Sequence, residues 1–196
     1  MFVNERESGY LGTFPKHNPA LAREYVRILS LGRIRSSSVV DFDTGLNPRA
    51  GWFCIGAYPG AAVFSGLSGL SRCTEEPENP LVKKIVAAFP NALLLATELA
   101  SANNYFGYTF YERGVLQRAL AGDADRGVVV DTGNRQAEED LLGERKDYIK
   151  SGETLVFSLS KRFFGCSLDK FAAERLTVEV LRTRRPIWPF SLMHES

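Results

Sequence analysis

The clearest structural signal in the sequence reads Tyr105-Phe-Gly-Tyr-Thr-Phe-Tyr111, Glu112-Arg-Gly114, Val115-Leu-Gln-Arg-Ala-Leu120, Asp123-Ala-Asp-Arg-Gly127 and Val128-Val-Val-Asp-Thr-Gly133. Three short strand-like runs are joined by two turn signals, which predicts a meander of antiparallel strands. In the first run Phe106, Tyr108 and Phe110 share one face, and the intervening residues share the other. A glycine inside such a strand allows another segment to pack closely over it, which we expect at Gly107.

The bulk composition is that of an ordinary globular chain. The protein has 196 residues, of which 44% are hydrophobic and 24% are charged, enough apolar material for a real core. We expect a single domain over residues 1–196, with residues 1–50 as a less readable N-terminal elaboration and 182–196 as a basic and aromatic tail. The net charge of +1 gives no global electrostatic reason to expect nucleic acid or an anionic membrane as a partner.

The cysteine content, the start of the sequence and its longest apolar region together predict a cytoplasmic location. Cys54, Cys73 and Cys166 are far apart and odd in number, which argues against a disulfide framework and for a reducing compartment. Residues 1–7 contain no apolar core of a secretory signal. The long apolar region at 81–100 is interrupted by lysines, a proline and an asparagine, so it is too broken to span a bilayer.

The predicted fold class is α+β, a mostly antiparallel sheet with helices packed on one face. Two helix starts are marked by asparagine followed by proline, at Asn18 and Asn79. The run at 92–99 suits a strand, with a helix as the alternative, and 152–164 suits a helix, with a strand as the alternative. The expected strands are 52–58, 92–99, 104–111, 115–121, 127–131 and 175–181, and the expected helices are 20–31, 80–89 and 152–164.

Familiar catalytic motifs fail on spacing or on missing partners. The two histidines, His17 and His194, lie near the ends of the sequence, which disfavours a Ser-His or Cys-His pair and a multi-histidine metal site. The serine and glycine run at 65–71 resembles a nucleophile elbow, but leucine stands where the last glycine is needed. The acidic stretch at 123–127 resembles a calcium loop, but its glycine comes one residue early, so we interpret it as a hairpin loop.

Two further groups offer chemistry without supporting partners in the sequence. Asp41 and Asp43 flank Phe42, and on a strand both carboxylates would point the same way, as in a metal or acid–base pair. Cys166, directly after Gly165, is a candidate reactive thiol. Because neither has other ligands or bases at a definable spacing, we predict no catalytic residue, cofactor or metal site.

An interaction surface is the more specific prediction. Basic residues beside aromatic ones can bind a partner protein or nucleic acid. The alternative is a tail whose aromatic residues fold back onto the core while its arginines remain solvated. The candidate surface consists of Tyr105, Tyr111, Arg184, Arg185, Trp188 and Phe190.

Two segments together resemble a known family. They are Trp52-Phe-Cys-Ile-Gly-Ala-Tyr-Pro-Gly60 and Phe106-Gly-Tyr-Thr-Phe-Tyr-Glu-Arg-Gly-Val-Leu-Gln-Arg-Ala-Leu120, the latter followed by Gly127-Val-Val-Val-Asp-Thr-Gly133. This arrangement is similar to an uncharacterised family of bacterial domains of unknown function. The resemblance covers about residues 50–165, implies an α+β domain and supplies no catalytic residues.

Three functions follow as hypotheses. The first is a non-enzymatic binding or regulatory domain of the bacterial cytoplasm that engages a protein partner or a second copy of itself. The second is an enzyme without a sequence signature, such as a carboxylate-dependent hydrolase, in which Arg118 and Asp131 converge. The third is nucleic-acid binding through Arg182, Arg184 and Arg185.

Overall fold

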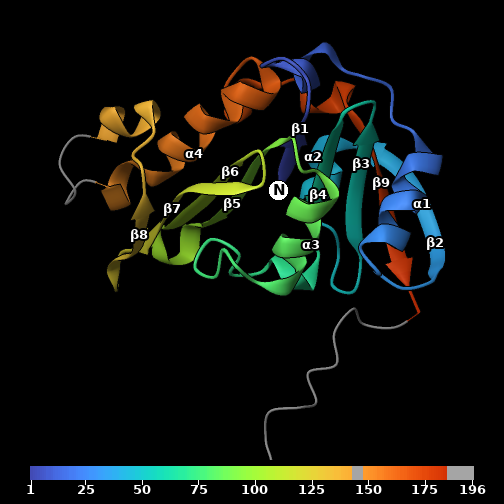
Figure 1. Ribbon diagram of the computed structural model, residues 1–196, viewed down its shortest axis with the longest axis horizontal. Coiled ribbons are helices and arrows are strands. Elements are labelled where there is room, and N and C mark those ends of the chain that lie inside the picture. Colours follow the sequence, from blue (N-terminus) through green and yellow to red (C-terminus); the bar gives the residue numbers. More distant parts are fainter. Residues whose placement is uncertain (143–147, 185–196) are drawn as a thin grey trace, which may run out of the picture.

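The computed structural model describes residues 1–142 and 148–184, and its core is one antiparallel sheet of nine strands (Figure 1). The strand order is β2-β9-β3-β4-β1-β5-β6-β7-β8, so the predicted α+β class is confirmed. The strands are β1 (Phe2–Asn4), β2 (Ile34–Asp41), β3 (Phe53–Tyr58), β4 (Ala61–Ser65), β5 (Leu93–Ala100), β6 (Tyr105–Glu112), β7 (Val115–Asp123), β8 (Gly127–Gly133) and β9 (Thr177–Thr183).

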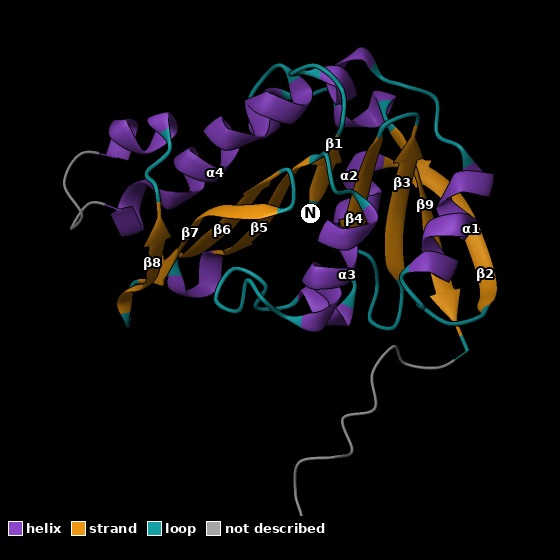
Figure 2. Ribbon diagram, in the orientation of Figure 1, coloured by secondary structure: helices purple, strands orange, loops and turns teal. Residues whose placement is uncertain are grey.

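Helices cover both faces of this sheet, so the expectation of helices on one face is wrong (Figure 2). The helices α1 (Pro19–Ile28) and α3 (Pro80–Ala88) pack on one face, and α2 (Phe42–Leu46) and α4 (Tyr148–Phe164) pack on the other. The reason lies in the central strands, which are apolar on both sides. In β3, for example, Ile55 belongs to the first core and Tyr58 to the second.

The first 50 residues are part of the sheet. Strand β1 lies at its centre, where Phe2 pairs with Val63 of β4 on one side and with Leu95 of β5 on the other. The polar stretch at residues 36–48 forms most of β2 and all of α2. A polar sequence can form β2 because this strand pairs with β9 alone and lies at the edge of the sheet, where it is largely exposed.

The predicted helix starts are confirmed. The side chains of Asn18 and Asn79 each accept two backbone N–H bonds at the start of α1 and α3. Helix α1 ends at Ile28 rather than near residue 31, and α4 begins at Tyr148 rather than at 152 because Tyr148 is already buried in the core. The strand at 93–100 and the helix at 148–164 settle the two alternatives that the sequence left open.

The meander β6-β7-β8 forms as expected. A two-residue turn joins β6 to β7, with Arg113 at φ 49° and Gly114 at φ 78°, the left-handed pair that a tight hairpin requires. The close packing predicted at Gly107 is also present: a Cβ added there would lie 2.5 Å from Oγ1 of Thr74. Within the described ranges, no helix has both the length and the apolar character needed to cross a membrane.

Candidate functional site

A groove opens between α3 and the turn that joins β6 to β7. Its volume is about 470 Å³. Apolar side chains make up most of the lining, and the charged groups come from Glu78, Lys83 and Arg113. The lining residues are Pro77, Glu78, Val82, Lys83, Val86, Ala87, Pro90, Tyr111, Arg113, Gly114 and Leu116.

Local sequence rules place the floor of the groove. Asn79 caps the start of α3, so Val82 and Val86 are both helical. Because they are four residues apart, they lie on the same side of the helix. On the strand side, Tyr111 pairs across the hairpin with Leu116, which brings both side chains to the face that α3 covers. The floor is therefore an extension of the core that the groove leaves partly open.

Tyr111 connects the floor to the loop that begins α3. Its hydroxyl donates a hydrogen bond to the backbone carbonyl of Pro77. Burial raises the pKa of Tyr111, with smaller contributions from Cys73 and Glu78. The phenol thus remains protonated at neutral pH and holds the wall of the groove in place.

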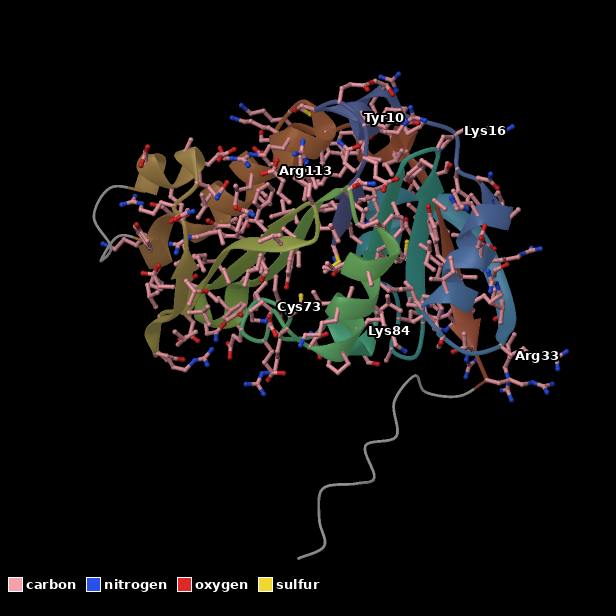
Figure 3. All side chains as sticks on the ribbon, viewed as in Figure 1. Tyr10, Lys16, Arg33, Cys73, Lys84 and Arg113 are labelled. Atoms are coloured by element: carbon pink, nitrogen blue, oxygen red, sulfur yellow. The ribbon has the colours of Figure 1, made fainter. Side chains whose placement is uncertain are left out.

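Arg113 supplies the cation at the rim. Its backbone N–H donates to the carbonyl of Ala92 at 3.1 Å, which holds the turn beside the end of α3. A left-handed conformation is costly for arginine, and such strain often occurs at binding sites. Within the part of the chain that the structure describes, its guanidinium has no ion-pair partner, whereas Lys83 pairs with Glu78 at 2.9 Å. Figure 3 labels Arg113 among the side chains.

Of the residues in the predicted interaction surface that the structure describes, only some are exposed to solvent. Tyr105 and Tyr111 were expected to be exposed but are 8% and 6% exposed, because residues 72–79 cover that face of the sheet. The Tyr105 hydroxyl lies 2.7 Å from Oγ1 of Thr74 in that loop. Arg184 is exposed. The remaining members, Arg185, Trp188 and Phe190, lie outside the described residues.

Arg118 and Asp131, which the hydrolase hypothesis expects to converge, do meet. Nη1 of Arg118 lies 2.7 Å from Oδ1 of Asp131. Nε and Nη2 of the same guanidinium donate hydrogen bonds of 2.9 and 2.8 Å to the carboxylate of Glu139. Sequence reasoning missed Glu139 and its second partner, Tyr108, whose hydroxyl donates to Glu139 Oε1 at 2.5 Å. No local pattern joins β6 and β7 to the 3₁₀ segment Ala137–Leu142.

This Arg118 cluster has the character of a structural brace. Arg118 is 2% exposed and Glu139 is 0% exposed, and their polar atoms bind one another. Burial by itself would raise the pKa of Glu139, but the hydrogen bonds from Arg118 and Tyr108 hold that pKa below its usual range. The cluster therefore attaches the 3₁₀ segment to the sheet with a fully ionised pair.

The remaining candidates are placed apart from one another. Asp41 is the N-cap of α2 and accepts from the backbone and hydroxyl of Thr44, whereas Asp43 lies within the helix, so the two carboxylates do not share a strand face. Cys54 is buried, and burial raises the pKa of its thiol to about 12. Cys166 is half-buried. The described residues contain no group of three or more His, Cys, Asp or Glu side chains placed to hold a metal.

Comparison with known proteins gives one match. Residues 1–157 match the model of a family described as a family of unknown function, which confirms the resemblance to an uncharacterised family. The match begins at residue 1, so the first 50 residues belong to the matched region, contrary to the range expected from the sequence. No curated protein and no solved structure matches the chain.

Proposed function

Since the chain belongs to the family of unknown function DUF6928, which supplies no inherited activity, we propose from its own geometry that it is a non-enzymatic binding domain. The groove between α3 and the β6–β7 turn takes an extended, apolar segment of a partner protein. This proposal keeps the expected setting, a bacterial cytoplasm, and the expected partner, another protein.

One observation carries the proposal: an apolar floor lies open beside Arg113, whose guanidinium is exposed and has no ion-pair partner within residues 1–142 and 148–184. Ala87 and Pro90 are exposed and Val86 and Leu116 are half-buried, so apolar surface remains in contact with water. Burying that surface beneath a partner would be favourable by about 25 cal/mol per Å². Arg113 would orient the bound segment, because its guanidinium pairs well with a carboxylate of the partner.

The ionisable groups of the lining support binding over catalysis. Glu78 and Lys83 are paired with each other, and Tyr111 is committed to Pro77. General acid–base catalysis needs a group within hydrogen-bond reach of a reacting atom and with a pKa near the working pH. The groups of this groove are better suited to holding a ligand than to transferring a proton.

Peptide selection tests the proposal directly. A library of random peptides is selected on the full chain, and the affinity of the enriched sequences is measured by calorimetry on two groove variants. Ala87→Glu puts a charge on the apolar wall, and Arg113→Asn removes the cation at a position where asparagine tolerates the backbone. Lys84→Glu, an exposed position on α3 outside the lining, is the matched control.

We expect both groove variants to weaken binding at least about tenfold, equivalent to about 1.4 kcal/mol, with the control unchanged. Enriched peptides that contain apolar residues and an acidic residue would agree with the floor and with Arg113. Equal affinity for the wild type and Ala87→Glu, or a failure of any sequence to enrich, would contradict the proposal.

The hydrolase alternative retains one specific observation, the convergence of Arg118 with Asp131 and Glu139. A carboxylate pair beside arginine can support hydrolysis. It predicts that Glu139→Gln abolishes an activity while the fold remains intact, which is the opposite of what a structural brace predicts.

A further inference from the structure

Four arginines from distant parts of the sequence meet at one end of the sheet. Strands β2 and β9 pair in antiparallel register, with Ile34 opposite Thr183 and Ser36 opposite Arg182. The backbone N–H of Arg184 donates to the carbonyl of Arg33 at 3.0 Å, so the ladder continues and places Arg33 opposite Arg184. We call this set, Arg33, Arg35, Arg182 and Arg184, the arginine patch.

The arginine patch carries unbalanced charge. Residues directly opposite on neighbouring strands share a face, and like charges in that position are destabilising. All four side chains are exposed, and within residues 1–142 and 148–184 none of them forms an ion pair. Figure 3 labels Arg33, which projects outward near the end of β9. The fold therefore maintains a local repulsion that an anionic ligand would relieve.

A break in the register adds to the concentration of charge. The pairing of β2 with β9 shifts between Ile34 and Ser36, and Arg35 is the extra residue at that shift. A bulge re-aims the side chain it carries and is common beside functional sites. Arg35 thus lies next to the other arginines without a cross-strand partner of its own.

An aromatic ring completes this surface. Trp52 directly precedes β3, and because Phe53 pairs with Leu181, Trp52 falls beside Arg182. The guanidinium carbon of Arg182 lies 5.9 Å from the centre of the Trp52 ring. Arginine stacked on an aromatic face keeps its N–H edges free for phosphate. Trp52 is half-buried, so part of its surface remains open to solvent.

We propose that the arginine patch and Trp52 bind single-stranded nucleic acid. The arginines contact successive phosphates, and Trp52 provides a surface on which a base stacks, the combination that non-sequence-specific single-strand binders use. The net charge of +1 disfavours nucleic acid for the chain as a whole, but strand pairing gathers these four exposed arginines where none has an ion-pair partner among the described residues. The tail arginines of the sequence contribute only two members, and Arg33, Arg35 and Trp52 come from the N-terminal third.

Salt dependence provides the first test. Binding of a fluorescein-labelled oligothymidylate of about 15 nucleotides is followed by anisotropy on the full chain between about 50 and 200 mM salt. We expect the logarithm of the binding constant to fall linearly with the logarithm of salt concentration, by about 0.7 per phosphate contacted. Binding that is absent at the lowest salt, or that does not change with salt, would overturn the proposal.

Charge-matched variants locate the site. Arg33→Gln with Arg184→Gln removes two charges from the arginine patch, and we expect the salt slope to shrink by about 1.4. Lys150→Gln with Lys161→Gln removes two exposed charges from α4 and should leave the slope unchanged. An equal loss in both double variants would show non-specific attraction and exclude this site.

Trp52 supplies a readout that general electrostatics would not change. In a Trp188→Phe background Trp52 is the remaining tryptophan, and its fluorescence should be quenched when the oligonucleotide binds. Trp52→Phe, which keeps a packed ring, should weaken binding about fivefold, in the range of a weakened stacking contact. Unquenched fluorescence with full affinity would contradict the stacking role, and stronger binding to anionic vesicles than to the oligonucleotide would assign the arginine patch to membranes.

Discussion

Nε2 of His17 lies 3.7 Å from Oε2 of Glu179, and both side chains are 3% exposed. Neither atom has a hydrogen-bond partner among the described residues. The other ring nitrogen, Nδ1, accepts the backbone N–H of Ala57 at 3.2 Å. Because Nδ1 acts as an acceptor, the neutral imidazole carries its proton on Nε2, on the side of Glu179. The loop before α1 is thus attached to β3 by one nitrogen and faces a buried carboxylate with the other.

This geometry predicts that acid destabilises the protein through His17. Burial lowers the pKa of His17 below 6.5, although Glu179 opposes part of the shift. The unfolded chain then takes up a proton at a higher pH than the folded chain, so stability is full above 6.5 and declines as the pH falls through the folded pKa. Titration of one such group changes the free energy of unfolding by at most about 1.4 kcal/mol per pH unit.

Urea unfolding between about pH 5 and 8 measures this effect, with His17→Gln as the comparison. The amine of Met1, whose pKa burial lowers to about 6, titrates with the same sign in both proteins, so the difference between them isolates His17. Identical pH profiles for the wild type and His17→Gln would show that His17 does not contribute.

The brace at Arg118 predicts a large loss of stability on Glu139→Gln. The substitution leaves a buried guanidinium with one carboxylate, Asp131, and breaking a buried pair costs about 3–5 kcal/mol. Glu138→Gln is the matched control, because Glu138 pairs with Arg162 at a partly exposed site and should cost about 1 kcal/mol or less. Urea midpoints compare the two. Similar midpoints would favour the hydrolase alternative over the brace.

Close packing over β6 predicts that Gly107→Ala is destabilising. The new Cβ would lie 2.5 Å from Oγ1 and 2.6 Å from Cβ of Thr74, so loop and strand must separate. Overpacking of this kind costs about 1–3 kcal/mol. A thermal-unfolding cycle with Thr74→Gly checks the cause, because removing that side chain should make Gly107→Ala less costly. Costs that simply add would contradict the contact.

The hydroxyl of Tyr111 predicts a smaller, separable effect. Tyr111→Phe removes the bond to the carbonyl of Pro77 and should cost about 1 kcal/mol, or about 2–4 °C in Tm. The ring remains in the groove, so binding of a selected peptide should change little. Tyr10→Phe should leave Tm unchanged and serves as the control, because the Tyr10 hydroxyl forms no hydrogen bond among the described residues. An unchanged Tm for Tyr111→Phe would show that this bond contributes nothing net.

Elements with local signals could be predicted, and elements that depend on pairing could not. The asparagine caps and the β6–β7 turn follow from side-chain and backbone preferences within a few residues. Strand β1 has three residues and no usable period, and it exists because Phe2 pairs on both sides. Strand β2 is too polar for its sequence alone to show a buried face, and it forms because its backbone pairs with that of β9.

The same division applies to the candidate sites. Alternation along β6 correctly placed Tyr105 and Tyr111 on one face, but it could not show that residues 72–79 cover that face. Arg118 and Asp131 were expected to converge, whereas Glu139 joined them without a local signal. Which residues become neighbours depends on chain segments that are distant in sequence.

The α+β class, the meander at 105–133 and the starts of α1 and α3 could be predicted from the amino-acid sequence, because hydrophobic period, turn geometry and capping act over a few residues. Tertiary structure alone decided that helices cover both faces, that His17 faces Glu179, and that Arg33 lies opposite Arg184. The physical reason is that strand order and register bring together residues whose spacing in the chain carries no trace of their contact.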